Sequence, residues 1–271
     1  KNVAKLKPKD LYNFYKTYYT PNKTTLILSG DFNIKQVTNK INSTFGKIKP
    51  LKCNIMSPGL DNRGINNNLI FSRNTNTLSY NLFIIFKIPY YYFDSEYYDN
   101  YALSMIMAKD LESILYKILR GKYGLIYSID YEVNLDEQHN TLSNISINTQ
   151  IEGKNLLKTI EIILKTLYQL KQKPISKEIY KKYLVDIDIA KLEDQICRDP
   201  EEFINLYGRN VIWDKKIETS KLMFKNLENV TPEKIKKCCC SVYRKENMII
   251  AYSGKSNYNS KIKNIINNAK I

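Results

Sequence analysis

The chain has 271 residues, of which 43% are apolar and 25% are charged. At about 150 residues per domain, this length gives between one and two globular domains, large enough to fold without disulfides or a structural metal. The formal net charge is +15, but only six of the 42 basic residues are arginine, so the charge indicates a lysine-rich composition rather than a nucleic-acid-binding surface.

The cysteines and the hydropathy pattern bear on the compartment. Three of the five cysteines are consecutive at 238–240 and the total is odd, which argues against a secreted disulfide framework and favours a reducing intracellular compartment, either the cytoplasm or an organelle. No apolar run approaches the roughly 18 residues of a membrane span, so we expect no membrane-spanning segment. The chain begins with Lys1 and has no signal-peptide pattern, which we interpret as the start of a processed or truncated piece.

The two ends of the chain repeat each other. Residues 8–30 read PKDLYNFYKTYYTPNKTTLILSG and residues 232–254 read PEKIKKCCCSVYRKENMIIAYSG, and they align without a gap at an offset of 224. Each copy predicts a helix that begins with proline, then a β-rich run that ends in glycine, then a second amphipathic helix. An offset of domain size predicts two homologous domains.

The repeat divides the chain into three parts. Residues 1–49 are expected to be the C-terminal tail of a first domain, of which the rest is absent. Residues 50–66 are rich in proline, glycine, asparagine and aspartate and predict a linker. Residues 67–271 are expected to form a complete second domain.

The second domain begins with a strand and a long helix. Residues 78–88 alternate and then become apolar on both faces, which predicts a central strand. Apolar side chains recur at helical spacing over residues 95–119 and predict one helix. Residues 125–133, in which Tyr127 shares a face with Ile129, and residues 142–151 both alternate, so they predict an antiparallel hairpin with one solvated face.

The rest of the domain is mostly helical. Helices are expected from residue 156 to about residue 242, followed by a strand at 248–253 and a last helix. This order of elements predicts the α+β class, with a mostly antiparallel sheet covered by helices.

The residues that usually hold metals give no recognisable zinc site. His139 is the single histidine and has no partner at H-x-x-H or H-x-x-E-H spacing, so we expect an exposed loop histidine. Cys238, Cys239 and Cys240 lie on a predicted helix, where neighbouring side chains point about 100° apart, so partial burial in the core is expected rather than metal binding. No glycine-rich phosphate loop is present.

Arg120 and Tyr127 form the candidate site. The segment LRGKYGLIYS, residues 119–128, predicts a helix that ends at Arg120, a turn containing Gly121 and Gly124, and a strand that begins at Tyr127. The two side chains can converge across this turn, and a guanidinium beside a phenol suits a peptide carbonyl or carboxylate. The spacing also allows a simpler interpretation, in which the arginine interacts with the helix dipole and the tyrosine is part of the core.

Three motifs together resemble a known family. They are FYKTYYTPNKTTLILSGDF at residues 14–32, the F-G-x-I segment at 45–48, and LRGKYGLIY at 119–127. The chain resembles the insulinase-type, or pitrilysin-like, zinc metallopeptidases, which include the mitochondrial processing peptidases. The resemblance covers nearly the whole chain and implies two similar α+β domains that enclose a chamber.

The resemblance also implies a function and its division between domains. In this family an inverted H-x-x-E-H motif and a later glutamate bind zinc, and the glutamate of the motif activates water for attack on the peptide bond. None of these ligands is in this chain, so the zinc is expected on upstream sequence, and the chain alone is expected to bind no metal, to hold no catalytic residue and to be inactive. It would be the C-terminal, substrate-binding portion of a zinc metalloendopeptidase.

Arg120 and Tyr127 match residues that face the zinc site in active relatives. The resemblance implies that they bind substrate or stabilise the tetrahedral intermediate. The expected partners are a peptide or unfolded protein substrate, and either the missing zinc domain or a homologous subunit.

Two alternatives remain at this point. One is a non-catalytic scaffold or core subunit of the same fold, like the partner subunit of the processing peptidases. The other is a basic nucleic-acid-binding module, which the scarcity of arginine and the lack of a binding motif disfavour. The presence of both Arg120 and Tyr127 favours an active parent protein over the scaffold.

Overall fold

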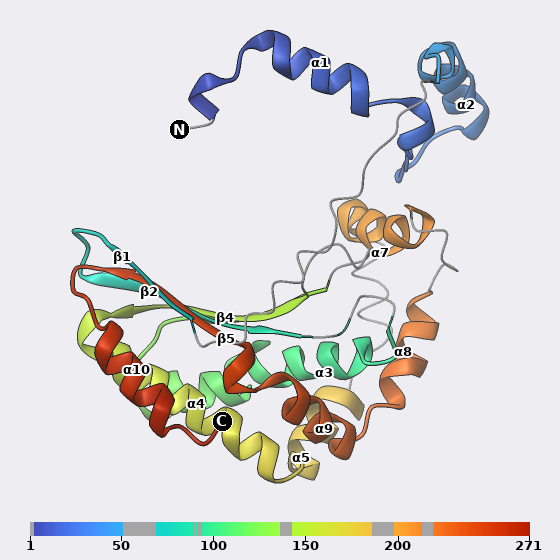
Figure 1. Cartoon of the computed structure of the whole chain (residues 1–271). Helices are drawn as coiled ribbons and strands as arrows, with labels where there is room; N and C mark the ends of the chain where they lie inside the picture. The colour runs from blue at the N-terminus through green and yellow to red at the C-terminus, as the bar shows by residue number, and fades with distance from the viewer. Residues whose placement is uncertain are drawn as a thin grey trace. The chain divides into compact units, whose positions relative to one another are not determined.

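The computed structural model describes residues 3–50, 69–88, 90, 94–135, 143–185, 198–212 and 219–271 (Figure 1). Cys53, His139, Cys197 and most of the expected linker lie outside these residues. The chain divides into two compact units, residues 1–58 with 188–220, and residues 59–187 with 221–271.

The larger unit contains a five-stranded sheet in the order β1-β5-β2-β4-β3. Its strands are β1 (Leu69–Asn74), β2 (Ser79–Lys87), β3 (Ile129–Asn134), β4 (Asn144–Glu152) and β5 (Met248–Gly254). β1 pairs with β5 in parallel, whereas β5–β2, β2–β4 and β4–β3 are antiparallel. The expected α+β class, the mostly antiparallel sheet, the central strand and the hairpin are confirmed.

Helices cover one face of this sheet, as Figure 1 shows for α3, α4, α9 and α10. The helices of the unit are α3 (Tyr97–Ala108), α4 (Leu156–Gln172), α5 (Lys177–Tyr180), α8 (Ser220–Glu228), α9 (Pro232–Val242) and α10 (Asn259–Asn268). None of the helices in the described ranges combines the length and the hydropathy that crossing a bilayer requires.

The two faces of the sheet differ because the strands alternate. Leu82, Ile84 and Phe86 on β2 are fully buried on the helix-covered face. Side chains of the opposite face, such as Ser79 and Asn81, are exposed. Burial of one such large apolar side chain contributes about 1.5–3 kcal/mol, so the covered face provides most of the stability of the sheet.

The expectation of one helix over residues 95–119 is wrong. α3 ends at Ala108, and the chain turns before the π-helical segment η4 (Tyr116–Lys122). Leu115 and Leu119 are fully buried after the break, so the apolar spacing continues although the helix does not. Leu111, expected on the apolar face, is 58% exposed.

Asp110 explains the break. Its carboxylate accepts a hydrogen bond from the backbone N–H of Glu112 at 2.9 Å and another from the hydroxyl of Tyr183 at 2.6 Å. Local bonds from an aspartate side chain to the backbone compete with the helical ladder. The bond to Tyr183 also ties the turn to the π-helical segment η6 (Lys181–Val185).

The smaller unit contains α1 (Pro8–Tyr18), α2 (Ile34–Ser43) and α7 (Pro200–Ile212). The side chain of Asn33 accepts a hydrogen bond from the N–H of Gln36 at 3.1 Å and so caps α2. The β-rich run expected at residues 24–30 is not a strand in this structure. The described residues of this unit include no strand that could pair with this run. An extended segment needs such a neighbour to complete its backbone hydrogen bonds.

The repeat in the sequence is also a repeat in structure. At the offset of 224 residues, α1 has the same bounds as α9, and the short 3₁₀ turn Pro21–Lys23 corresponds to Lys245–Asn247. α2 and α10 match to within one residue. The copies differ in the extended segment between their two helices: in the described part of the chain β5 pairs with β1 and β2, whereas residues 24–30 pair with no strand.

Candidate functional site

The candidate pair lies on the segment that connects η4 to β3. Arg120 is inside η4, and Tyr127 comes two residues before β3 begins, so the expectation that Arg120 ends a long helix and Tyr127 begins the strand is wrong in detail. Gly124 has a φ of +58°, and its N–H donates to the carbonyl of Arg120 at 3.1 Å. A glycine in this conformation commonly ends a helix because it has no Cβ to clash.

The structure brings Arg120 and Tyr127 together. Nη1 of Arg120 donates to the backbone carbonyl of Tyr127 at 2.9 Å. The guanidinium carbon also lies 4.8 Å from the centre of the Tyr127 ring, within the range of a cation–π contact. The interpretation of Tyr127 as a core residue is wrong, because the residue is 80% exposed.

The contacts between Arg120 and Tyr127 therefore hold the guanidinium and the phenol, both hydrogen-bond donors, in a defined position that is open to solvent. The bond to the Tyr127 carbonyl uses one of the five N–H donors of the guanidinium. The phenol of Tyr127 can donate a further hydrogen bond. Two such groups held by a short turn can bind a carbonyl oxygen or a carboxylate.

Tyr127 is one of the residues that line a cavity of about 610 Å³. Its walls come from the loop after η4, from the paired ends of β2 and β4, and from the beginning of α4; the lining residues are Ser79, Tyr123, Gly124, Leu125, Ile126, Tyr127, Gln150, Ile151, Glu152, Lys154, Asn155 and Lys158. Its volume is within the range of about 300–1,000 Å³ that is typical of ligand sites.

Several charged side chains line this cavity or lie beside it. Lys154 forms an ion pair with Glu152 at 2.6 Å. The ammonium groups of Lys122 and Lys158 lie 5.4 Å and 5.1 Å from the centre of the Tyr123 ring. Reasoning from the sequence missed these residues, because they are far apart in the chain and no motif connects them.

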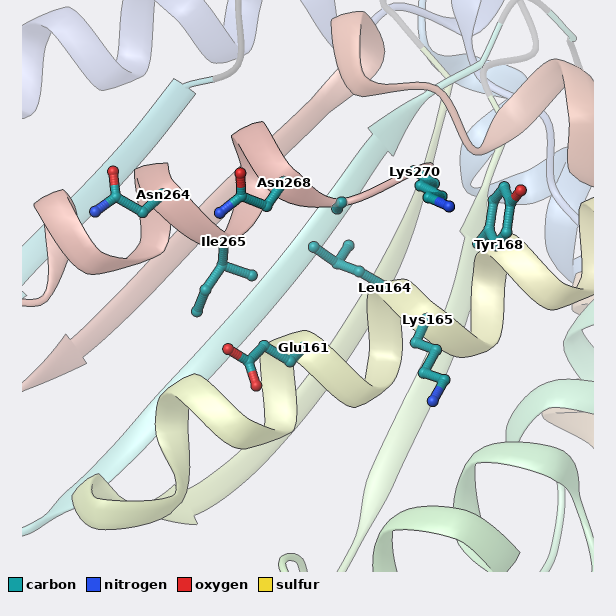
Figure 2. A pocket seen from close by; sticks show the side chains of 9 residues that line it. Glu161, Leu164, Lys165, Tyr168, Asn264, Ile265, Asn268 and Lys270 are labelled. Carbon is teal, nitrogen blue, oxygen red and sulfur yellow. The ribbon is translucent and has the colours of Figure 1, made fainter.

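A second cavity, of about 540 Å³, lies between α4 and α10. Figure 2 shows that Glu161, Leu164 and Lys165 reach it from α4, and that Asn264 and Asn268 belong to α10. Its walls are parts of two helices of the layer that covers the sheet. Neither Arg120 nor Tyr127 lines it.

The three consecutive cysteines are partly in the core. Cys238 and Cys239 are buried and Cys240 is exposed, so the expected partial burial is confirmed. Cys238 donates to Oδ1 of Asn100 at 3.4 Å. Burial raises the pKa of both buried thiols, which disfavours the thiolate form that metals and electrophiles require.

Beside them, the hydroxyls of Tyr131 and Tyr243 are 2.6 Å apart in the core. Burial raises the pKa of both phenols well above its usual value. Both phenols therefore stay neutral, and the hydrogen bond between them satisfies two buried polar groups, which is a structural role.

Zinc has no matching set of ligands in the part of the chain that the structure describes. There, no group of three or more histidine, cysteine, aspartate or glutamate side chains is close enough to hold a metal ion. The described residues therefore do not fit the zinc that the sequence resemblance implies, and we assign no step through a metal to them. His139 lies outside these residues.

Solved structures share the fold at low identity. A protease from Helicobacter pylori is 15% identical with a TM-score of 0.79, and the match covers 93% of this chain and 60% of that chain. The first half of the periplasmic protease PqqL from Escherichia coli is 14% identical with a TM-score of 0.72, covering 99% and 61%. A peptidase M16 inactive domain from Pseudomonas fluorescens is 13% identical with a TM-score of 0.61, covering 77% and 48%. The chain thus spans between about half and three fifths of these proteins.

The sequence itself matches a family model. No curated protein matches the chain, but the model described as the peptidase M16 inactive domain matches residues 5–184. This region is more than half of the chain and includes both Arg120 and Tyr127. The chain therefore belongs to the peptidase M16 inactive-domain family.

Proposed function

We propose that this chain is the substrate-binding, non-zinc portion of an M16-type zinc metalloendopeptidase. In this proposal Arg120 and Tyr127 bind the peptide and stabilise the tetrahedral intermediate of its hydrolysis. The zinc is held by a homologous domain, either in the same polypeptide or in a partner subunit. The observation that carries the proposal is the exposed, mutually ordered Arg120–Tyr127 pair, of which Tyr127 also lines a cavity.

The chemistry of the pair suits a developing oxyanion. A guanidinium and a phenol both donate hydrogen bonds, and donors that are oriented in advance are most effective where negative charge appears during the reaction. The 2.9 Å bond from Arg120 to the Tyr127 carbonyl and the cation–π contact with the ring orient the guanidinium before a ligand arrives. A buried tyrosine or a salt-bridged arginine would have supported a purely structural role.

A homologous domain as partner is supported by the N-terminal copy of the repeat. Leu11, Phe14 and Leu26 are 60%, 56% and 48% exposed. At the same offset in the second copy, Ile235 and Ile250 are fully buried. Among the described residues, the smaller unit thus exposes apolar side chains at positions that are buried in the second copy.

We therefore propose that residues 1–49 are the tail of a first domain of the same fold. A sheet and helices like those of the larger unit would cover the exposed side chains and pair with residues 24–30. Residues 50–66 would be the linker and residues 67–271 the second domain. Burying such apolar area is the main driving force for association of this kind.

The test is peptide hydrolysis by the chain assembled with its zinc-bearing domain. Arg120→Ala should lower kcat/KM about 100-fold, in the range seen when one oxyanion donor is removed, while the circular dichroism spectrum is unchanged. Tyr127→Phe removes only the hydroxyl and should lower kcat/KM less. Arg244→Ala is the matched control, because Arg244 pairs with Glu246 on the surface.

Unchanged kcat/KM in both Arg120→Ala and Tyr127→Phe would refute the proposed role. The same result, together with retained assembly, is what the non-catalytic scaffold alternative predicts. The experiment therefore separates the two functions.

A further inference from the structure

The cavity beside Tyr127 is arranged to receive a side chain of a bound peptide. Tyr127 belongs both to the candidate pair and to the cavity wall. A peptide held by Arg120 and Tyr127 would therefore place a neighbouring residue at the cavity entrance. Ser79 and Gln150 line the cavity with exposed side chains of the sheet, and Asn155 and Lys158 line it from the beginning of α4, so the cavity lies where β2 begins and β4 ends.

The charges of the lining favour an anion. Lys154 and Glu152 neutralise each other at 2.6 Å. Lys158 also lines the cavity, and within the described ranges no carboxylate lies at ion-pair distance from it. Its ammonium lies over the Tyr123 ring, with Lys122 over the same ring. The lining therefore has a surplus of positive charge.

The neutral polar groups are compatible with the same ligand. Ser79, Gln150 and Asn155 line the cavity, and each carries a side-chain donor that a carboxylate can accept from. A lysine or arginine side chain entering here would meet Lys158 and be repelled. This repulsion would contribute to selectivity as much as the attraction.

We propose that this cavity is a specificity subsite for an acidic side chain, aspartate or glutamate, of the bound peptide, with Lys158 as the cation that pairs with its carboxylate. The inference rests on the proposed function, because it requires a peptide on the Arg120–Tyr127 pair. Tyr123 is a positioning residue that holds the ammonium of Lys158 by a cation–π contact.

Equilibrium binding to the full chain tests the subsite. The probes are fluorescein-labelled extended peptides of alanine, serine and threonine that carry one glutamate, and twins in which glutamine replaces it, with that residue placed at each position in turn. Fluorescence anisotropy gives the Kd of each. At one position the glutamate peptide should bind about two- to fivefold more tightly than its twin, which is the range of a solvent-accessible ion pair.

Variants assign this preference to the cavity. Lys158→Gln should abolish it, and Glu152→Gln should increase it because a competing carboxylate is removed. Lys165→Gln is the matched control, since Lys165 is on the same helix but lines the cavity between α4 and α10. Tyr123→Phe should keep the preference and Tyr123→Leu should reduce it. Added salt should weaken the preference in the wild-type chain.

The results distinguish this proposal from the proposed function. Equal binding of the twins at every position, or a preference that survives Lys158→Gln, would overturn the subsite. Arg120→Ala should weaken both twins to the same extent if the proposed function is correct. A preference that persists while Arg120→Ala changes neither Kd would overturn the role of the pair and keep an anion site, and no binding of either peptide would overturn both.

Discussion

Gly254→Ala should destabilise the larger unit by about 2–4 kcal/mol, the sum of overpacking and a disturbed hydrogen bond. A Cβ on Gly254 would lie closer than 3.0 Å to three ring atoms of Tyr80. The ring cannot move away to the other side, because it already packs against Gly153 there. A Cβ built on Gly153 would also be closer than 3.0 Å to the ring. Tyr80 is thus packed between the backbones of two glycines.

Two terms make up this magnitude. Forcing one extra carbon into a packed core costs about 1–3 kcal/mol. A displaced Tyr80 would also weaken the bond that its hydroxyl accepts from the N–H of Ser256 at 2.6 Å, which contributes about 1 kcal/mol. The ring is only 3% exposed, so water cannot replace the lost contacts.

The assay is urea denaturation followed by far-ultraviolet circular dichroism, with hydrogen–deuterium exchange of β5 peptides to assign the transition to the larger unit. Gly121→Ala is the control, since the nearest atom to its added Cβ would be 4.0 Å away. In Gly254→Ala combined with Tyr80→Leu, the two effects should be less than additive by about 1 kcal/mol, as for residues in contact. An unchanged midpoint in Gly254→Ala, or strict additivity, would show that the packing argument is wrong.

Three further predictions use other parts of the molecule. Ile250→Ala should cost about 2–5 kcal/mol, as for a fully buried aliphatic residue. Leu26→Ala, at the equivalent position, should change the urea midpoint of the isolated chain by less than about 0.5 kcal/mol; a large loss would mean that its face is already packed. Burial raises the pKa of Asp110, but hydrogen bonds from Tyr183 and the backbone and the charge of a nearby lysine outweigh it, so the pKa is lowered overall. This group therefore stabilises the fold above its unfolded pKa of about 3.9, and the contribution is lost as pH falls through the lower folded pKa. The urea midpoint of Asp110→Asn should accordingly depend less on pH in this acidic window, and an equal dependence would count against the assignment. Cys240 should react with N-ethylmaleimide faster than the two buried cysteines before it, as mass spectrometry of the labelled peptides can measure, and equal rates would contradict the burial.

The sheet could be predicted from the sequence because its strands have a clear period. β2 and β5 bury every second side chain, and alternation is visible without any knowledge of neighbours. The two copies of the repeat could also be aligned, and their helices have matching bounds. Both results follow from patterns of residue types in the sequence and need no knowledge of tertiary contacts.

The errors arose where tertiary contacts override a local pattern. The apolar period runs through residues 95–119, but the Asp110 carboxylate breaks the helix by accepting hydrogen bonds from the backbone N–H of Glu112 and from the hydroxyl of Tyr183. The alternation of the next segment extends to Tyr127, yet the strand begins only at Ile129. In both places the spacing of apolar residues was correct and the interpretation of the element was not.

The candidate site was only partly accessible to sequence reasoning. The L-R-x-x-x-G-L-x-Y motif pointed to Arg120 and Tyr127, and the expected convergence of the two side chains is confirmed, whereas their role in binding stays a prediction. The cavity could not be predicted, because the pairing of β2 with β4 and the first turn of α4 bring Ser79, Glu152 and Lys158 to one place. The spacing of these residues in the sequence does not indicate that they lie close together.

Helices cover one face of the sheet and the other face is exposed, so the two faces tolerate substitutions differently during evolution. Along β2 and β4, neighbouring residues in the chain serve different needs, since one side chain packs under the helices and the next faces outward. In the proposed subsite, a substitution at Ser79 or Gln150 would change recognition at little cost in folding free energy, whereas Leu82 or Ile147 can hardly vary. Under that proposal, selection can alter the ligand preference one residue at a time while the scaffold beneath stays the same.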